Sequence, residues 1–208
     1  EFGHFCDAFV NYDSSTSLDL SETYSQGTEL LTLLKLKTVL SKEDYNALYI
    51  AEMSRILFDV FIVQGFYARF EELAYALPYD EITRENLDRC VLNAALDFGL
   101  NPLYCNSLEV VTISHIMLYP FYVQSYCTSA AVALQLFFSE SAEKGAGLAS
   151  LKALMDRGDR EETFVGFVTG AGLDSPFRKH LLKDLANEIY YGIVGKYYYR
   201  QNYTPNAT

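Results

Sequence analysis

The sequence predicts an all-α fold. Apolar side chains recur at helical spacing along most of the 208 residues, and helix caps and helix breakers separate the apolar stretches. No hairpin signature and no alternation of strand-like and helix-like segments interrupts this pattern. Neither an internal repeat nor an obvious linker divides the chain, so we expect a single helical domain over residues 1–208.

The first part of the chain predicts two helices of unequal length. Leucines at helical spacing predict an amphipathic helix over 29–40. Ser41 is a suitable N-cap for a very long helix over 42–76. Leu77 and Pro78 close that helix, because the residue before a proline avoids the α region.

The middle of the chain predicts a capped helix and a long uncharged one. Thr83 can cap a helix that ends near Gly99, since glycine is common just beyond a helix C-terminus. The segment 107–141 reads as a long uncharged helix, kinked at Pro120.

The last part of the chain predicts three further helices. Two short ones are expected over 148–155 and 160–169. Asp174, Ser175 and Pro176 supply an N-cap and a first-turn proline for a final helix that reaches about Tyr199.

Composition excludes several classes of function. The formal net charge of −11 argues against a broad nucleic-acid interface, whose phosphates require Lys and Arg. The 4 cysteines are widely spaced and form no C-x-x-C pair, which favours reduced thiols and a cytoplasmic protein. The uncharged stretch 116–138 is long enough to span a bilayer, but Pro120 and several polar residues interrupt it, so we expect no membrane span.

The first candidate site lies at the start of the chain. Glu1 and His4 have the spacing of the Glu and the second His in His-Glu-x-x-His, where two imidazoles bind zinc and the Glu acts as general base. By themselves these residues match that motif as readily by chance. Glu22 and Glu29 lie two helical turns apart and could add a metal ligand and a carboxylate that orients a ligand histidine, or could form a solvated acidic face.

A second candidate site is a row of aromatic residues in 114–126. His115, Tyr119, Tyr122 and Tyr126 are spaced four, three and four apart, so one helix would place them along one face. Such donors could bind a peptide and stabilise the oxyanion of its hydrolysis. The alternative is an aromatic core stripe whose hydroxyl groups bond to backbone carbonyls.

These motifs together resemble the thimet-type zinc oligopeptidases, in particular the oligoendopeptidase F branch. The resemblance begins with EFGH and DLSETYSQGTELL, which match the pattern H-E-[FLA]-G-H followed by a Glu, a Ser-Gln pair and a second Glu seven residues after the first. It continues through four further stretches in the same order and covers nearly the whole chain. These stretches are 66–77, 77–83, 115–133 and 171–177.

The resemblance implies a role for each candidate residue. His4 would be the second zinc ligand, Glu22 the third and Glu1 the general base, while Glu29 would be a carboxylate behind the ligands. His115, Tyr122 and Tyr126 would bind the substrate and its carbonyl oxygen. The implied fold is the helical catalytic part of a zincin-like oligopeptidase. Its expected segments are zinc-site helices in 1–40, a helical pair in 42–100, a Tyr-rich substrate-binding helix in 105–141, C-terminal helices in 147–200 and a mobile tail in 201–208.

The same resemblance places the first zinc ligand before Glu1, so we expect the C-terminal portion of a longer peptidase. Such a chain would need its missing N-terminal portion as a partner, would be inactive alone, and would act on oligopeptides with one zinc ion when complete. It could also self-associate through apolar surface left uncovered. The alternative hypothesis is a non-catalytic helical scaffold or binding module related to a peptidase.

Overall fold

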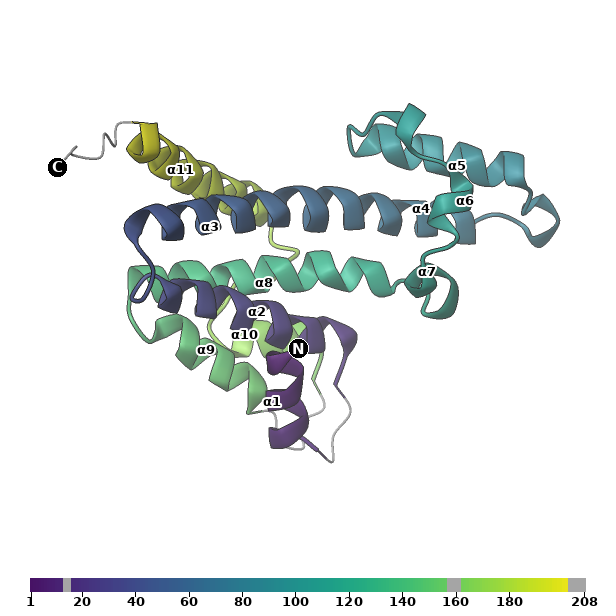
Figure 1. Ribbon diagram of the computed structural model, residues 1–208. Coiled ribbons are helices and arrows are strands. Elements are labelled where there is room, and N and C mark those ends of the chain that lie inside the picture. The colour runs from purple at the N-terminus through teal and green to yellow at the C-terminus, as the bar shows by residue number, and fades with distance from the viewer. Residues whose placement is uncertain (13–15, 157–161, 202–208) are drawn as a thin grey trace. The chain divides into compact units, whose positions relative to one another are not determined.

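The computed structural model describes residues 1–12, 16–156 and 162–201, and every regular element in these ranges is a helix (Figure 1). This confirms the all-α prediction. None of these helices combines the length and the apolar character needed to cross a membrane. The expected tail lies outside the described residues from 202 onward, as does the expected helix start at residue 160.

The chain forms two compact units, the first made of 1–56 with 128–208 and the second of 57–127. In the first unit, α1 lies against α2, α2 and α10 lie against α9, and α11 lies against α3. Its core joins Leu20 and Tyr24 to apolar side chains of α8, α9 and α10. The helices of this unit are α1 (Phe2–Val10), α2 (Leu18–Leu36), α3 (Lys42–Arg55), α9 (Ala146–Met155), α10 (Phe164–Gly170), α11 (Leu181–Gln201) and the greater part of α8 (Tyr122–Ala142).

The second unit has its own core, built around Phe66, Phe70 and Val91. α4 lies against α5, and α5 lies against α6. The unit contains the π-helix η1 (Ile56–Gln64) from its second residue on, α4 (Gly65–Tyr75), the 3-10 turns η2 (Tyr79–Glu81) and η3 (Pro102–Tyr104), α5 (Arg84–Asp97), α6 (Ser107–Val110), α7 (Ser114–Leu118) and the beginning of α8.

The helix boundaries that depend on local capping are confirmed. The Ser41 hydroxyl accepts the Asp44 N–H at 3.1 Å and begins α3, and Thr83 caps α5 in the same way. Gly99 follows α5 with φ of +67°, a left-handed conformation that glycine adopts without strain. Helical backbone continues from α3 through η1 to Tyr75, just before the Leu77-Pro78 pair.

The prediction of one long helix over 107–141 is wrong. The segment forms α6, α7 and α8, with breaks at 111–113 and 119–121. Pro120 has no N–H to donate, and Phe121 adopts a left-handed φ of +63°, so the chain does more than kink there.

The predicted start of the last helix at 174–176 is also wrong, because α11 begins at Leu181. The Asp174 N–H donates to Gln135 Oε1 at 2.8 Å, and Gln135 Nε2 donates to the Asp174 carbonyl at 3.0 Å. This side-chain bridge holds the segment against α8, and His180, with φ of +71°, then separates it from the helix.

The contact between α1 and α2 leaves no room for a side chain at residue 3. A Cβ on Gly3 would lie 2.0 Å from the Tyr24 carbonyl oxygen, a backbone atom that cannot move aside by changing rotamer. Glycine is therefore required at this position for the two backbones to meet.

We predict that Gly3→Ala destabilises the protein by about 1–3 kcal/mol or more, because the added methyl group must push the helices apart. Gly170→Ala is the matched control, since a Cβ there meets no heavy atom within 4 Å. Urea unfolding followed by circular dichroism measures both. A Gly3→Ala protein as stable as the Gly170→Ala protein would contradict the close approach.

Candidate functional site

The α1–α2 contact brings the two predicted metal ligands together. His4 lies one residue after Gly3, and Glu22 lies two residues before Tyr24, so the backbone contact places both side chains at the same junction. His4 Nε2 is 4.0 Å from Glu22 Oε2. The Glu22 side chain is 9% exposed and that of His4 is 32% exposed, so the carboxylate is buried and the imidazole is reachable from solvent.

The other nitrogen of His4 also has a partner. Ser21 Oγ is 3.0 Å from His4 Nδ1, which leaves Nε2 directed at Glu22. Histidines that bind metals commonly hydrogen-bond through the second ring nitrogen, because this fixes the ring orientation. The sequence analysis missed Ser21, although it directly precedes Glu22 in the DLSE stretch.

The His4–Glu22 pair fits a zinc ion in donor type, and its spacing is somewhat wider than two zinc ligands adopt. Zinc accepts imidazole nitrogen and carboxylate oxygen, and tetrahedral bonds of about 2.0–2.2 Å hold two such atoms about 3.3–3.6 Å apart. The observed 4.0 Å lies a few tenths of an ångström beyond that range. Within the described ranges, no three His, Cys, Asp or Glu side chains are grouped to hold a metal ion.

Glu1, the N-cap of α1, and Glu29 of α2 belong to a different part of the α1–α2 contact from the His4–Glu22 pair. Both line a cavity of about 570 Å³ with Glu52, and His4 and Glu22 are not among its lining residues. Burial raises the pKa of Glu29, the nearby Glu52 carboxylate raises it further, and Arg55 lowers it. Glu29 Oε2 lies 3.4 Å from an Arg55 guanidinium nitrogen, so its ion-pair partner is an arginine, while the hydrogen-bond partner of His4 Nδ1 is Ser21.

The second unit brings His115 together with the predicted tyrosines. The His115 ring centroid lies 4.8 Å from that of Tyr122 and 6.2 Å from that of Tyr126, and the two tyrosine rings are 5.3 Å apart. Tyr119 joins at the edge, 6.3 Å from Tyr122, and is 60% exposed. The other three side chains are half-buried, so imidazole and phenol groups gather at a surface that solvent reaches.

This aromatic cluster (His115, Tyr119, Tyr122 and Tyr126) forms although the expected continuous helix is broken. His115 belongs to α7, whereas Tyr122 and Tyr126 belong to α8. Across the break between these helices, the His115 ring still lies against Tyr122. The four residues therefore lie together, although not along one continuous helix as the sequence spacing predicted.

Glu71 of α4 stabilises the turn between α7 and α8. The sequence analysis did not single it out. Its side chain is fully buried, and Oε1 accepts the Phe121 N–H at 2.8 Å. Among the described residues, the buried Oε2 has no hydrogen-bond partner. Tyr75, one turn further along α4, donates its hydroxyl to the Ile116 carbonyl at 2.7 Å, so α4 fixes both sides of the break.

Burial changes the ionisation of two groups near this turn. It raises the pKa of the Glu71 carboxyl, and the hydrogen bond from Phe121 offsets part of this rise. It also raises the pKa of Cys127 to about 12, and the thiol donates to the Val60 carbonyl with 3.2 Å between sulfur and oxygen. All 4 cysteines of the chain are free thiols.

Comparison of the chain with protein-family models, with curated proteins and with solved structures finds no match. The functional proposal therefore depends on the motifs quoted above and on the geometry of these residues.

We predict that Glu71 makes stability depend on pH. Because its pKa in the folded protein is raised above the ordinary value of 4.5, its stabilising contribution is complete below that value and is lost as the pH rises through the raised pKa. Glu71→Gln keeps an acceptor for Phe121 but cannot ionise. Urea unfolding between pH 4 and pH 8 should therefore show a flatter profile for this variant.

Two further variants complete this test. Glu71→Leu removes the acceptor and should cost about 1–3 kcal/mol. Glu72→Gln is the control on the same helix, since that carboxylate is exposed and should leave the pH profile unchanged. An identical profile for Glu71→Gln and the unaltered protein would contradict the role of Glu71.

Proposed function

We propose that this chain carries part of the active site of a cytoplasmic zinc endopeptidase that hydrolyses short oligopeptides. The observation that supports the proposal best is the approach of His4 to Glu22. The two residues come from different helices, have donor atoms that zinc accepts, and face each other at 4.0 Å beside a glycine that the contact requires. A proposed cytoplasmic location agrees with four free thiols.

In this proposal His4 and Glu22 supply two of the three protein ligands of a catalytic zinc, and a polypeptide segment outside this sequence supplies the third. Zinc, when bound, polarises a carbonyl group and lowers the pKa of a water molecule. Ser21 keeps His4 Nε2 directed at the metal position. By the resemblance, Glu1 would take the proton of the attacking water, which requires its carboxylate to reach the metal position from the neighbouring cavity that it lines.

The aromatic cluster has the chemistry of a peptide-binding surface. The Tyr122 and Tyr126 hydroxyl groups can donate hydrogen bonds to a peptide carbonyl, and so can a ring nitrogen of His115. By the resemblance, donors of this kind would stabilise the negative charge that develops on the carbonyl oxygen during hydrolysis. The half-buried rings allow a ligand to reach these groups from solvent.

The metal site can be tested by zinc binding, independently of catalysis. We predict weak binding of Zn²⁺ to this chain, since two ligands do not complete a site, and a loss of affinity of at least about tenfold for His4→Ala and for Glu22→Gln. Isothermal titration calorimetry at pH 7 measures this. His180→Asn is the control, because His180 is exposed and lies elsewhere in the sequence. Zinc affinity that His4→Ala leaves unchanged would overturn the ligand assignment.

Catalysis is tested with a quenched fluorescent oligopeptide. We expect the chain alone to show little or no zinc-dependent hydrolysis and the natural full-length protein to hydrolyse the peptide. In the full-length protein, Tyr122→Phe should lower kcat/KM by about tenfold or more, because it removes a donor to the carbonyl oxygen. Tyr79→Phe is the matched control, at an exposed tyrosine outside the aromatic cluster. Rapid turnover by the chain alone would contradict the ligand count.

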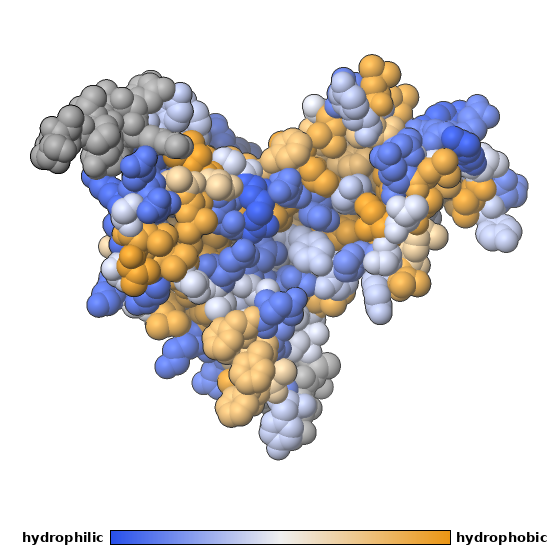
Figure 2. All heavy atoms as spheres, in the orientation of Figure 1, coloured by the Kyte–Doolittle hydropathy of each residue, from blue (hydrophilic) through white to orange (hydrophobic). Residues whose placement is uncertain are grey.

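A non-catalytic binding module is the second candidate function, and one surface feature favours it. Phe2, Phe5 and Phe9 stack along α1 with ring centroids 6.1 and 6.3 Å apart, and each is more than 60% exposed. Figure 2 shows these apolar side chains gathered at the surface over α1. A partner protein or a second copy of the chain could cover them. A full-length protein that contains no zinc would favour this function over the peptidase.

A further inference from the structure

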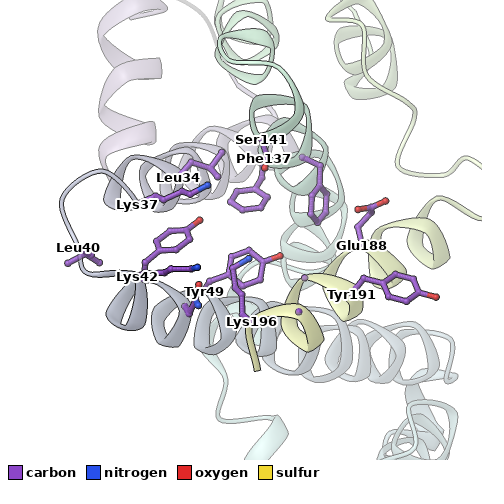
Figure 3. A pocket seen from close by; sticks show the side chains of 15 residues that line it. Leu34, Lys37, Leu40, Lys42, Tyr49, Phe137, Ser141, Glu188, Tyr191 and Lys196 are labelled. Atoms are coloured by element: carbon purple, nitrogen blue, oxygen red, sulfur yellow. The ribbon is translucent and has the colours of Figure 1, made fainter. Parts of the chain in front are cut away.

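A cavity of about 820 Å³ lies in the first unit, where the C-terminal end of α2 and the beginning of α3 face α8 and α11 (Figure 3). Its volume falls within the range of pockets that bind small molecules, about 300–1,000 Å³. The cavity is separate from the His4–Glu22 pair. Lys37, on its rim, lies 15 positions beyond Glu22 along α2, which corresponds to about 22 Å of helix.

Three lysines line this cavity in a chain whose net charge is −11. Lys37, Lys42 and Lys196 come from the end of α2, the start of α3 and the last turns of α11, and Figure 3 shows their side chains extending toward the same space. Among the described side chains that line the cavity, Glu188 is the one acidic residue. The cavity wall is therefore positive although the chain is strongly acidic.

Lys196 is held in place by an aromatic ring instead of a carboxylate. Its ammonium nitrogen lies 3.8 Å from the centroid of the Tyr49 ring, and the side chain is half-buried. Burial lowers the pKa of Lys196, and the charge of Lys37 lowers it further, so the two ammonium groups repel each other. Within the described residues, neither lysine forms an ion pair.

The rest of the wall is aromatic and aliphatic. Tyr45, Tyr49 and Phe137 are each at most 5% exposed. Burial raises the pKa of Tyr49 to about 12, so its hydroxyl stays neutral and does not repel an anion. Gly192 admits the Tyr49 ring, since a Cβ at this position would lie 2.1 Å from the Tyr49 hydroxyl oxygen. Leu34 and Phe138 line the same cavity and are only half-buried, so a flat apolar group can pack against them.

We propose that this cavity binds a small organic anion, in which an aromatic body packs against the half-buried Leu34 and Phe138 and a phosphate or carboxylate group binds Lys37 and Lys196. Such a ligand brings negative charge to two lysines that repel each other without it. Its aromatic body occupies the apolar part of the cavity, which an inorganic anion would leave unfilled. The site and its ligand are independent of the proposed peptidase activity.

The probe is phenyl phosphate, compared with benzoate, inorganic phosphate and phenol, each titrated into the full chain at pH 7 and low salt. Protein NMR shifts follow the binding. We expect saturable binding of phenyl phosphate or benzoate, with the tighter of the two identifying the preferred anion. Inorganic phosphate and phenol should bind at least about tenfold more weakly, because inorganic phosphate lacks the aromatic ring and phenol lacks the anionic group.

Variants locate the site. Lys37→Gln and Lys196→Gln should each weaken binding of the aromatic anion at least about fivefold, whereas Lys183→Gln, an exposed lysine of α11 outside the cavity, should leave it unchanged. Lys37 is also exposed, so its substitution tests the site without unfolding the protein. Absence of saturable binding, equal binding of inorganic phosphate, or equal losses in Lys183→Gln and Lys37→Gln would each overturn the proposal.

Discussion

The backbones of α1 and α2 meet at Gly3 and Tyr24, and the arrangement of the proposed metal ligands depends on this contact. Any side chain at residue 3 would occupy the position of the Tyr24 carbonyl group. Tyr24 is itself fully buried and donates its hydroxyl to the Leu154 carbonyl of α9 at 2.7 Å. The short helix α1 is thus anchored on α2, and α2 on α9. His4 meets Glu22 and Ser21 because the packing of α1 on α2, and of α2 on α9, sets the position of its backbone.

In the second unit a buried carboxylate has a comparable structural role. Glu71 accepts the N–H of Phe121, a residue with a left-handed backbone, and this interaction compensates for the backbone hydrogen bonds that the chain loses around Pro120. The aromatic cluster then forms across two short helical segments. In the part of the chain that the structure describes, the second oxygen of Glu71 has no hydrogen-bond partner, so its burial costs free energy that the bond to Phe121 partly offsets.

Features that arise within a few residues could be predicted from the sequence, and features that arise between distant residues could not. Ser41 and Thr83 cap their helices through bonds to the third residue along the chain, so their patterns are visible locally. Gln135 and Asp174 are 39 residues apart, and Glu71 and Phe121 are 50 apart, which is why the two helix boundaries there were wrong. The His4–Glu22 pair was expected from the resemblance to a family motif. The lysine-lined cavity combines residues of several helices that are far apart in the sequence, so no local sequence pattern predicts it.

The contact between Cys127 and Val60 makes one thiol of the protein a natural reporter of local opening. A thiol with a pKa of about 12 carries almost no thiolate at neutral pH, and only the thiolate reacts with alkylating reagents or peroxides. Modification at this sulfur therefore requires that the start of α8 first separate from η1. The rate at which iodoacetamide labels Cys127 would measure how often that separation occurs, in the native protein and without an added fluorophore.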